Sequence, residues 1–422
     1  MLRLPHKSIR YAFLRQLLSR YRLPPGDWIK LDNVERSNRR FLLEHVTEVG
    51  SMFKAIAWDT FWVCVVGIPQ CQRLLREHGD DLKPVTLELE MLFPKGFLRQ
   101  MEAADHQHYR MALVRAIKSS STVDNGASWD EIATSGLSHY ANLQQETEHS
   151  PETYIRSLDA IATGMLIQVF YGANFNSIEY KELIRCYRKL GPYGLVFNIA
   201  EPQQQAFTEI HAFLVNLVKN KKCRNSIIIY LYENDLLDDT MLGNLIYMVE
   251  MGRYDLYSLF RWISKYAAIY PDLLKSASPS LIDAFVQETL RMDQSEALLR
   301  TAKRDIVFEG YLIPKHAKVR LCMWEAHKSA ATFTDPLIFN PERFLNSNYA
   351  HDQYAPFGLD HHRCPFSDMV LKMSKTFLSV LVANYGVRAI SDDMPVKGAY
   401  HWEPASRFSV ELSSRNNKEQ MA

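Results

Sequence analysis

The sequence predicts a mainly α-helical protein with a small β region. From about residue 106 to residue 273 the apolar residues recur mainly at intervals of three and four, which is the spacing of one helical face. After Arg291 this pattern gives way to short runs of β-branched and aromatic residues around glycine and proline, which is typical of strands and turns. Apolar residues make up 47% of the 422-residue chain, so it can bury a substantial core.

The first element lies within an N-terminal segment, residues 1–30, in which basic residues alternate with leucines and aromatic residues. This pattern favours a helix packed on its own domain, and an amphipathic helix on a membrane surface is the alternative. No apolar run reaches the roughly 18 residues that a membrane span requires, and no signal-peptide pattern is present. We therefore expect a cytoplasmic protein without a membrane span.

A short strand comes next, followed by a long helical block. Residues 63–67 are apolar and β-branched and end at Gly67, before a proline and a helical spacing, which predicts a strand, a turn and a helix. The block is broken by proline at positions 151, 192 and 202. Residues 238–270 contain no proline and predict one unusually long helix or a tight helix pair.

The last third of the chain mixes strands and helix. Residues 306–314 and 319–323 predict a small antiparallel sheet, and residues 365–384 predict another helix. The tail at residues 416–422 is polar, and we expect it to be disordered. We expect a single domain over residues 1–422.

Charge and cysteine usage exclude several classes of protein. The 49 basic residues nearly balance the 48 acidic ones, so no strong basic field indicates nucleic acid as a partner. The six cysteines lack CxxC spacing, which argues against a disulfide framework or a structural zinc site. Five of them fit small buried hydrophobes, whereas Cys364 has unusual neighbours.

Those neighbours form the segment Ala-Pro-Phe-Gly-Leu-Asp-His-His-Arg-Cys-Pro-Phe, residues 355–366, directly before a helical pattern. The segment resembles the haem-binding loop of the cytochromes P450, whose usual form is FGxGxHxCxG. The resemblance implies that Phe357 shields the proximal side of haem b, Gly358 permits a tight turn, His362 reaches a haem propionate and Cys364 ligates the iron. A thiolate ligand donates electron density to iron and favours O–O cleavage.

The loop departs from the family's form at two positions. Asp360 and Phe366 stand where the loop usually has glycine. Taken alone, the loop also fits a metal cluster of His361, His362 and Cys364, or an ordinary loop.

Two further motifs follow the family's order along the chain. Glu288-Thr289-Leu290-Arg291 fits the ExxR motif, and Arg343 lies in a Pro-Glu-Arg-Phe segment shortly before the cysteine loop. Residues three apart share a helical face, so Glu288 and Arg291 can meet and receive Arg343. A lone ExxR is usually a surface salt bridge, but the resemblance implies a triad that supports the proximal core.

Four basic side chains resemble the family's propionate ligands. His106 and Arg110 are spaced four apart on one helical face, like the family's HxxxR motif, and Arg300 resembles the later strand arginine. Together with His362 they would pair with two buried carboxylates. Taken singly, each is also compatible with a solvated charge.

The family's oxygen-activation motif is altered. Counting back from Tyr270-Pro271, the motif falls on residues 251–255, where Gly252 is retained and Asp255 replaces the usual threonine. A glycine lets oxygen or substrate approach the helix backbone, and Asp255 could deliver protons. The alternative is that the register is off by a residue and Asp255 makes a structural ion pair with Arg253 or a neighbour.

The positions that contact substrate in the family are mainly apolar and aromatic here. This composition suits a flat or lipophilic molecule, although any one of these residues also fits a core position. The pocket that the resemblance implies is lined by Leu92, Phe93, Phe97, Leu98, Phe197, Met248, Met251, Ala297 and Leu298.

The resemblance implies a cytochrome P450 fold of soluble bacterial type, a helical triangular prism that encloses haem, and a monomeric protein. It implies oxidation of a small aromatic or lipophilic metabolite in a biosynthetic pathway. Electrons would come from NAD(P)H through a separate ferredoxin or flavodoxin-type donor, because no GxGxxG fingerprint is present. The missing threonine favours oxidative coupling or cyclisation, with hydroxylation and a haem-binding module with little turnover as the alternatives.

Overall fold

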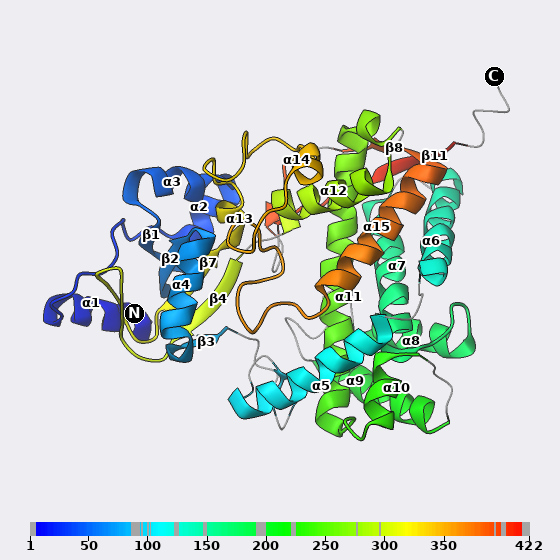
Figure 1. The fold of residues 1–422 in the computed structure, drawn as a ribbon, viewed down its shortest axis with the longest axis horizontal. Coiled ribbons are helices and arrows are strands. Elements are labelled where there is room, and N and C mark those ends of the chain that lie inside the picture. The colour runs from blue at the N-terminus through cyan, green and yellow to red at the C-terminus, as the bar shows by residue number, and fades with distance from the viewer. Residues whose placement is uncertain are drawn as a thin grey trace. The chain divides into compact units, whose positions relative to one another are not determined.

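The computed structural model describes residues 6–415 with gaps at 86–92, 94–95, 99–100, 102, 122–125, 147–149, 191–199, 221–224, 276, 295–296, 392–393 and 398–401. It confirms the prediction of a mainly α protein with a small β part (Figure 1). The chain divides into two compact units, which are described separately. The first consists of Met1–Val85, Gln287–Cys364 and Val396–Trp402, and the second of Thr86–Val286, Pro365–Pro395 and Glu403–Ala422. The single domain expected over residues 1–422 stays a prediction.

The first unit is built on a five-stranded sheet in the order β1-β2-β7-β4-β3. Its strands are β1 (Met52–Ala57), β2 (Thr60–Val66), β7 (Lys318–Cys322), β4 (Ala297–Ala302) and β3 (Leu82–Pro84). The β1–β2, β4–β7 and β3–β4 pairs are antiparallel, whereas β2 and β7 run parallel.

Both faces of this sheet are buried. Val63 and Val65 of β2 point to one side, where they join a core with Ile68 and Leu74 of helix α4 (Ile68–His78). Trp62 and Cys64 alternate with them and join a second core with residues of α2 (Leu31–Ser37) and α3 (Phe41–Val49). Gly67 has a φ of +112°, so a glycine ends β2 at the turn into α4, as the sequence predicts.

The first unit contains several further elements. They are α1 (Lys7–Leu18), the 3₁₀ turn η1 (Gly79–Asp81), the π turn η5 (Leu290–Gln294), the hairpin of β5 (Ile306–Phe308) and β6 (Tyr311–Ile313), α13 (Met323–Ala326), α14 (Glu342–Asn346) and β9 (Val396–Lys397), which pairs with β10 (Trp402–Glu403).

The sequence prediction of one small antiparallel sheet after Arg291 is only partly correct. The β5–β6 hairpin is antiparallel but forms a sheet of its own. Strand β7 instead enters the larger sheet, next to a strand from the beginning of the chain. Periodicity identifies a strand but does not identify a partner that is distant in sequence.

Helix α1 packs on its own unit and also exposes apolar side chains. Ser8, Ile9 and Ala12 are buried, and the helix lies against β2. Leu17 is 83% exposed and Leu18 is 68% exposed.

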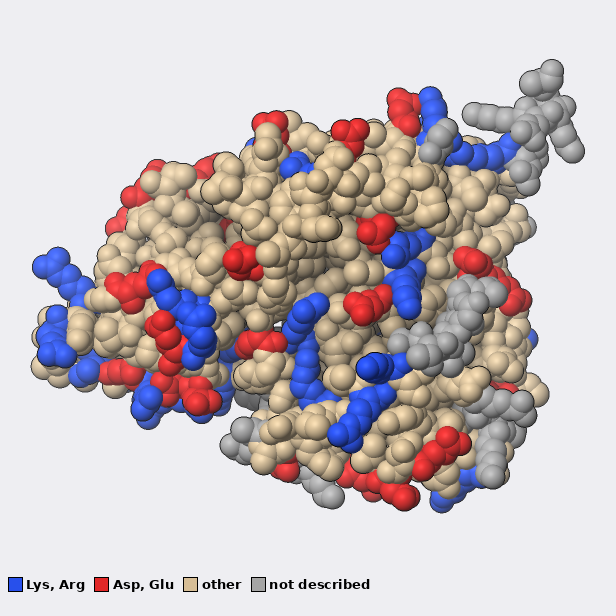
Figure 2. Space-filling view, in the orientation of Figure 1, with Lys and Arg blue, Asp and Glu red and all other residues tan. Residues whose placement is uncertain are grey.

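No helix in the described part of the chain combines the length and the hydrophobicity needed to cross a bilayer. On the face shown in Figure 2, basic and acidic side chains are interspersed.

The second unit is a helical bundle around the long helix α11 (Asp239–Ile269), which packs mainly on α7 (Pro151–Tyr171) and also on α15 (Ser367–Asn384). Its other elements are α5 (Ala103–Ser121), α6 (Gly126–Glu146), α8 (Ile178–Lys189), α9 (Glu201–Lys219), α10 (Ile227–Glu233), the 3₁₀ turn η4 (Pro271–Leu274) and the β8 (Tyr385–Ala389) and β11 (Val410–Ser414) pair. Helix α12 (Pro279–Thr289) runs from the second unit into the first.

Local signals explain where α11 begins and ends. The Asp238 side chain accepts a hydrogen bond from the Met241 backbone N–H at 2.7 Å, which caps the N-terminus. The helix ends just before Pro271, which cannot continue it. The segment 238–270 therefore contains one 31-residue helix, residues 239–269, rather than a helix pair.

Candidate functional site

Cys364 lies at the end of a closed loop in the first unit. Its backbone N–H donates a hydrogen bond to the Phe357 carbonyl oxygen at 2.8 Å. Gly358 has a φ of +103°, and a Cβ added there would lie 3.3 Å from the Arg363 Cα. A side chain at this position would be strained, so the loop requires glycine here. Helix α15 begins three residues after Cys364, at Ser367.

The exposure of Cys364 sets it apart from the other described cysteines. Cys64, Cys71, Cys186 and Cys322 are buried, whereas Cys364 is partly exposed. A buried thiol behaves as a small hydrophobe, and burial raises the pKa of Cys71 to about 12. The geometry therefore leaves Cys364 the best placed of these five thiols to meet a ligand.

Arg300 and Asp360 form an ion pair beside this loop. Arg300, on β4, is 2% exposed, and its Nη2 donates to Asp360 Oδ2 at 2.8 Å. Asp360 Oδ1 accepts the His362 backbone N–H at 2.9 Å. Burial opposes ionisation of Asp360, but the Arg300 guanidinium and these hydrogen bonds hold its pKa below the usual value.

This depressed pKa predicts a dependence of stability on pH. A carboxyl whose pKa is lower in the folded state stabilises the fold above its unfolded pKa of about 4, and this contribution is lost as the pH falls through the folded pKa. We expect Asp360→Asn to unfold more easily than the unmodified protein at pH 7. Urea titrations of both proteins between about pH 7 and pH 3 should show this difference shrinking as the solution is acidified. A difference that grows towards acid would contradict the pairing.

The three side chains of the ExxR and Pro-Glu-Arg-Phe motifs meet in the same unit. Arg291 donates to both carboxylate oxygens of Glu288, at 2.7 and 2.8 Å. Arg343 Nε donates to Glu288 Oε1 at 3.1 Å. Glu288 and Arg291 are 0% exposed, so this triad is a buried cluster rather than the surface salt bridge that a lone ExxR would suggest.

His327 connects this triad to the cysteine loop. Arg291 Nη1 donates to the His327 carbonyl oxygen at 2.9 Å, and His327 Nε2 accepts the Ala355 backbone N–H at 3.1 Å. Burial, followed by the nearby Lys328 and Arg291 charges, lowers the pKa of His327 well below its usual value, which keeps Nε2 free to accept. Ala355 begins the loop, and its carbonyl oxygen accepts the Gly358 N–H at 3.3 Å. Sequence reasoning missed His327, because no spacing pattern indicates it.

In the second unit, one face of α11 is less buried than the rest of the helix. Met248, Met251, Gly252 and Asp255 are partly exposed, while every other residue from Thr240 to Ala267 is buried. Their spacing of three, four and seven residues places all four on one face of the helix, which we call the open stripe. Two predicted pocket residues and both predicted catalytic residues therefore share a solvent-accessible surface.

Arg253, which the sequence offered as an ion-pair partner for Asp255, has carboxylate partners elsewhere. Its guanidinium donates to Asp159 of α7 at 3.0 Å and to Glu250 at 2.7 Å. Arg253 and Glu250 are buried, and burial raises the pKa of Glu250 even though Arg253 opposes the shift. This cluster fastens α11 to α7.

Gly252 is not required by close packing. A Cβ added there would lie 3.4 Å from the nearest atom, Cδ1 of Leu166, which is ordinary van der Waals contact. At Gly136 of α6, by contrast, a Cβ would lie 2.3 Å from Cγ1 of Ile161. Packing can therefore explain the glycine at position 136 but not the one at position 252.

Alanine substitutions at these two glycines should have opposite effects on stability. We expect Gly136→Ala to lower the free energy of unfolding by about 1–3 kcal/mol, because the added methyl group overpacks the α6–α7 contact. Gly252→Ala should raise it by about 0.5–1 kcal/mol, because alanine favours the helix. Urea denaturation followed by circular dichroism measures both. A large loss at position 252 would show that packing does select this glycine.

The other predicted residues are placed as follows. His106, which is buried, and Arg110, which is partly exposed, lie on α5 with a helical spacing of four. Phe93 and Phe97 are buried with Tyr247, whose ring centroid lies 4.2 Å from that of Phe97.

Three of the remaining pocket residues have described positions. Ala297 and Leu298 lie on β4 of the first unit, and Leu298 packs against the core there. The Leu98 backbone N–H donates to the side chain of Asn244 at 2.8 Å. Leu92 and Phe197 lie outside the described residues.

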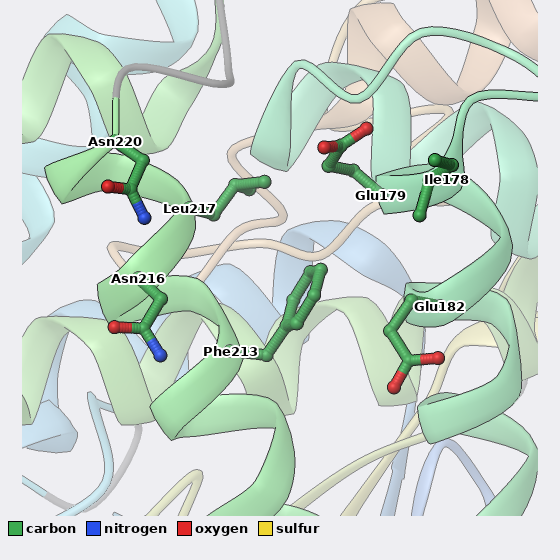
Figure 3. A pocket seen from close by; sticks show the side chains of 7 residues that line it. All are labelled: Ile178, Glu179, Glu182, Phe213, Asn216, Leu217 and Asn220. Atoms are coloured by element: carbon green, nitrogen blue, oxygen red, sulfur yellow. The ribbon is translucent and has the colours of Figure 1, made fainter.

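A surface hollow between α8 and α9 contains none of the predicted site residues (Figure 3). It combines apolar side chains with carboxylate and amide groups, and it is lined by Ile178, Glu179, Glu182, Phe213, Asn216, Leu217 and Asn220.

The cysteine loop fits haem better than a metal cluster. Within the described ranges, no three His, Cys, Asp or Glu side chains gather as a metal ion would require. The loop instead combines a partly exposed thiol with the buried cation Arg300. A haem group needs a thiolate for its iron and cations for its carboxylates. Cys364 meets the first need, and Arg300 is a buried cation near the loop whose guanidinium is bound to Asp360 in this structure.

Comparisons with known proteins point in the same direction. The family model described as Cytochrome P450 matches residues 276–402. Abscisic acid 8'-hydroxylase 1 of Arabidopsis thaliana is 25% identical, over 87% of this chain and 88% of that protein. Ent-kaurenoic acid oxidase 1 of the same plant is 24% identical, over 47% of this chain and 46% of that protein. A retinoic acid-bound cyanobacterial CYP120A1 superposes with a TM-score of 0.70 and 17% identity, over 93% of this chain and 100% of that chain.

Proposed function

Because the chain belongs to the cytochrome P450 superfamily, an oxidoreductase family that binds haem through a cysteine, we propose that Cys364 is its thiolate ligand. The observation that carries this proposal is the loop that ends at Cys364, closed by a hydrogen bond to Phe357 and supported through His327 by the buried triad. A haem bound to this thiolate would supply the oxidising chemistry, since thiolate ligation favours O–O cleavage. In this proposal Glu288, Arg291 and Arg343 hold the loop in place and do not take part in the reaction.

The proposed substrate is a lipophilic metabolite. Met248 and Met251 supply flexible apolar surface on the open stripe, and Phe93 and Phe97 lie in an aromatic cluster with Tyr247 of the same helix. The names of the compared proteins contain abscisic acid, kaurenoic acid and retinoic acid. These three are apolar molecules that carry a carboxylic acid, so we propose this class as the first to screen.

Asp255 is the proposed proton carrier of the open stripe. It is partly exposed, on the same helical face as Gly252. A carboxyl group can hold and pass a proton to a reacting oxygen, as a hydroxyl with ordered water does. Hydroxylation of the substrate is the reaction that such proton delivery serves.

A second candidate reaction is oxidative coupling or cyclisation, in which hydrogen is removed from the substrate and no oxygen is inserted. The observation that favours it is the carboxyl at position 255, where the family usually has a threonine hydroxyl. Such a reaction does not need proton delivery to a reacting oxygen in the way that oxygen insertion does.

The mass of the product decides between the two reactions. Hydroxylation adds one oxygen to the substrate, whereas coupling or cyclisation removes two hydrogens. If Asp255 delivers protons, Asp255→Asn should slow product formation by about 10²- to 10⁴-fold while substrate-induced shifts of the haem spectrum persist. Asp239→Asn is the matched control, because Asp239 begins the same helix and its side chain is 94% exposed. An unchanged rate of product formation in Asp255→Asn would contradict proton delivery by Asp255. A haem spectrum in the unmodified protein without any turnover would favour a haem-binding module.

The electron donor and the cellular location stay predictions from the sequence. We propose a separate ferredoxin or flavodoxin-type donor that receives electrons from NAD(P)H. Reconstitution with donors of each kind, followed by the rate of haem reduction, tests this choice. We also propose a cytoplasmic, monomeric protein, which cell fractionation and light scattering test.

A further inference from the structure

Arg300 has a carboxylate partner within the chain itself. The guanidinium is nearly completely buried, with Nη1 donating to the Leu299 carbonyl oxygen at 3.0 Å and Nη2 donating to Asp360 at 2.8 Å. The Asp360 side chain is 14% exposed and also accepts the His362 backbone N–H. One carboxylate therefore bridges strand β4 and the cysteine loop, and both ends of this bridge lie in the first unit.

The Asp360 carboxylate is present because the loop of this chain differs from the family's usual loop at this position. Position 360 usually holds glycine in the family's FGxGxHxCxG form, and glycine has no charge to offer. The φ of Asp360 is not positive, so the backbone conformation here does not demand glycine. The same resemblance assigns Arg300 to a haem propionate. In this chain the cation expected to hold a propionate is already neutralised by an aspartate.

We propose that Asp360 is an internal counter-anion of Arg300 that competes with a haem propionate for this cation and so weakens the retention of haem. The inference rests on the proposed haem site. A propionate that approaches a lone buried guanidinium gains a charge-assisted hydrogen bond. A propionate that approaches an Arg–Asp pair gains less, because it meets a second carboxylate of the same sign. In return, the bridge ties the cysteine loop to the sheet whether or not haem is bound.

The test is the rate at which haem moves from the protein to an excess of apomyoglobin. We expect Asp360→Asn to slow haem loss by about tenfold, the size of one charge-assisted hydrogen bond regained by a propionate. The amide oxygen of this variant can still accept the His362 N–H. Asp360→Gly, which restores the usual residue, should slow the loss in the same direction. Asp81→Asn is the matched control, because Asp81 is similarly buried and pairs with Arg304 in the same unit, so its rate should not change.

Repeating the transfer experiment with haem dimethyl ester shows whether Asp360→Asn changes the rate of haem loss through a propionate or through a change in the loop. Its propionates are esterified and cannot pair with Arg300, so Asp360→Asn should not slow its loss. The proposal would be overturned if both Asp360 variants lost haem as fast as the unmodified protein, or faster. It would also be overturned if Asp360→Asn slowed the loss of the dimethyl ester as much as it slowed the loss of haem. Failure of the proposed haem site is recognised separately, because the unmodified protein would then lack a thiolate-type spectrum, whatever the rates of haem transfer.

Discussion

Replacing Glu288 by glutamine should lower the free energy of unfolding by about 3–5 kcal/mol. Glu288 accepts hydrogen bonds from Arg291, from Arg343 and from the Asn340 backbone N–H at 2.9 Å. Glutamine has nearly the same shape but no charge, so two guanidinium groups would lose their carboxylate. Arg291 is completely buried, and an unpaired cation there cannot recover its hydration.

The same variant should also disturb the cysteine loop, because Arg291 holds the His327 carbonyl and His327 holds the Ala355 N–H. Urea denaturation followed by both circular dichroism and haem absorbance measures the two effects. Glu152→Gln is the control, since Glu152 pairs with Arg156 on the surface and both side chains are at least 80% exposed. That variant should change stability by less than about 0.5 kcal/mol. Equal stabilities for the two variants would contradict a supporting role for the triad.

Replacing Cys364 by alanine should abolish thiolate ligation of the haem. Alanine has no donor atom, and the remaining described cysteines are buried and so cannot substitute for it. We expect the purified variant to contain little haem and to lack the thiolate-type absorption band. The haem content per chain and the absorption spectrum measure the loss.

Cys186→Ala is the control for this substitution. Cys186 is a buried residue of α8 in the second unit, so its replacement should leave the haem spectrum unchanged. A thiolate-type spectrum that persisted in Cys364→Ala would transfer the ligand assignment to another cysteine.

Much of the fold could be predicted from local patterns in the sequence. The proline at position 151 marks the start of α7, and Asp238 and Pro271 bracket α11, because caps and breakers act over a few residues. The parallel pairing of β2 with β7 could not be predicted, since it joins two strands that are far apart in the sequence. Alternation of apolar residues identifies the buried faces of a strand but not its neighbour.

The candidate site shows the same division between what is local and what is distant. Spacing alone placed Glu288 and Arg291 on one helical face, and the structure brings them together. The sequence shows that Asp360 replaces the glycine of the family loop. Its pairing with Arg300 could not be predicted, because it depends on where β4 lies against that loop. The open stripe cannot be predicted from the sequence either, because the exposure of Met248 and Asp255 depends on how the whole bundle packs.

The carbon monoxide difference spectrum of the reduced, haem-loaded protein tests the central claim most directly. If Cys364 is the ligand, the unmodified protein should show the long-wavelength Soret band that is characteristic of thiolate-bound haem, and Cys364→Ala should not. A band typical of histidine-ligated haem in the unmodified protein, or no Soret band at all, would contradict the claim.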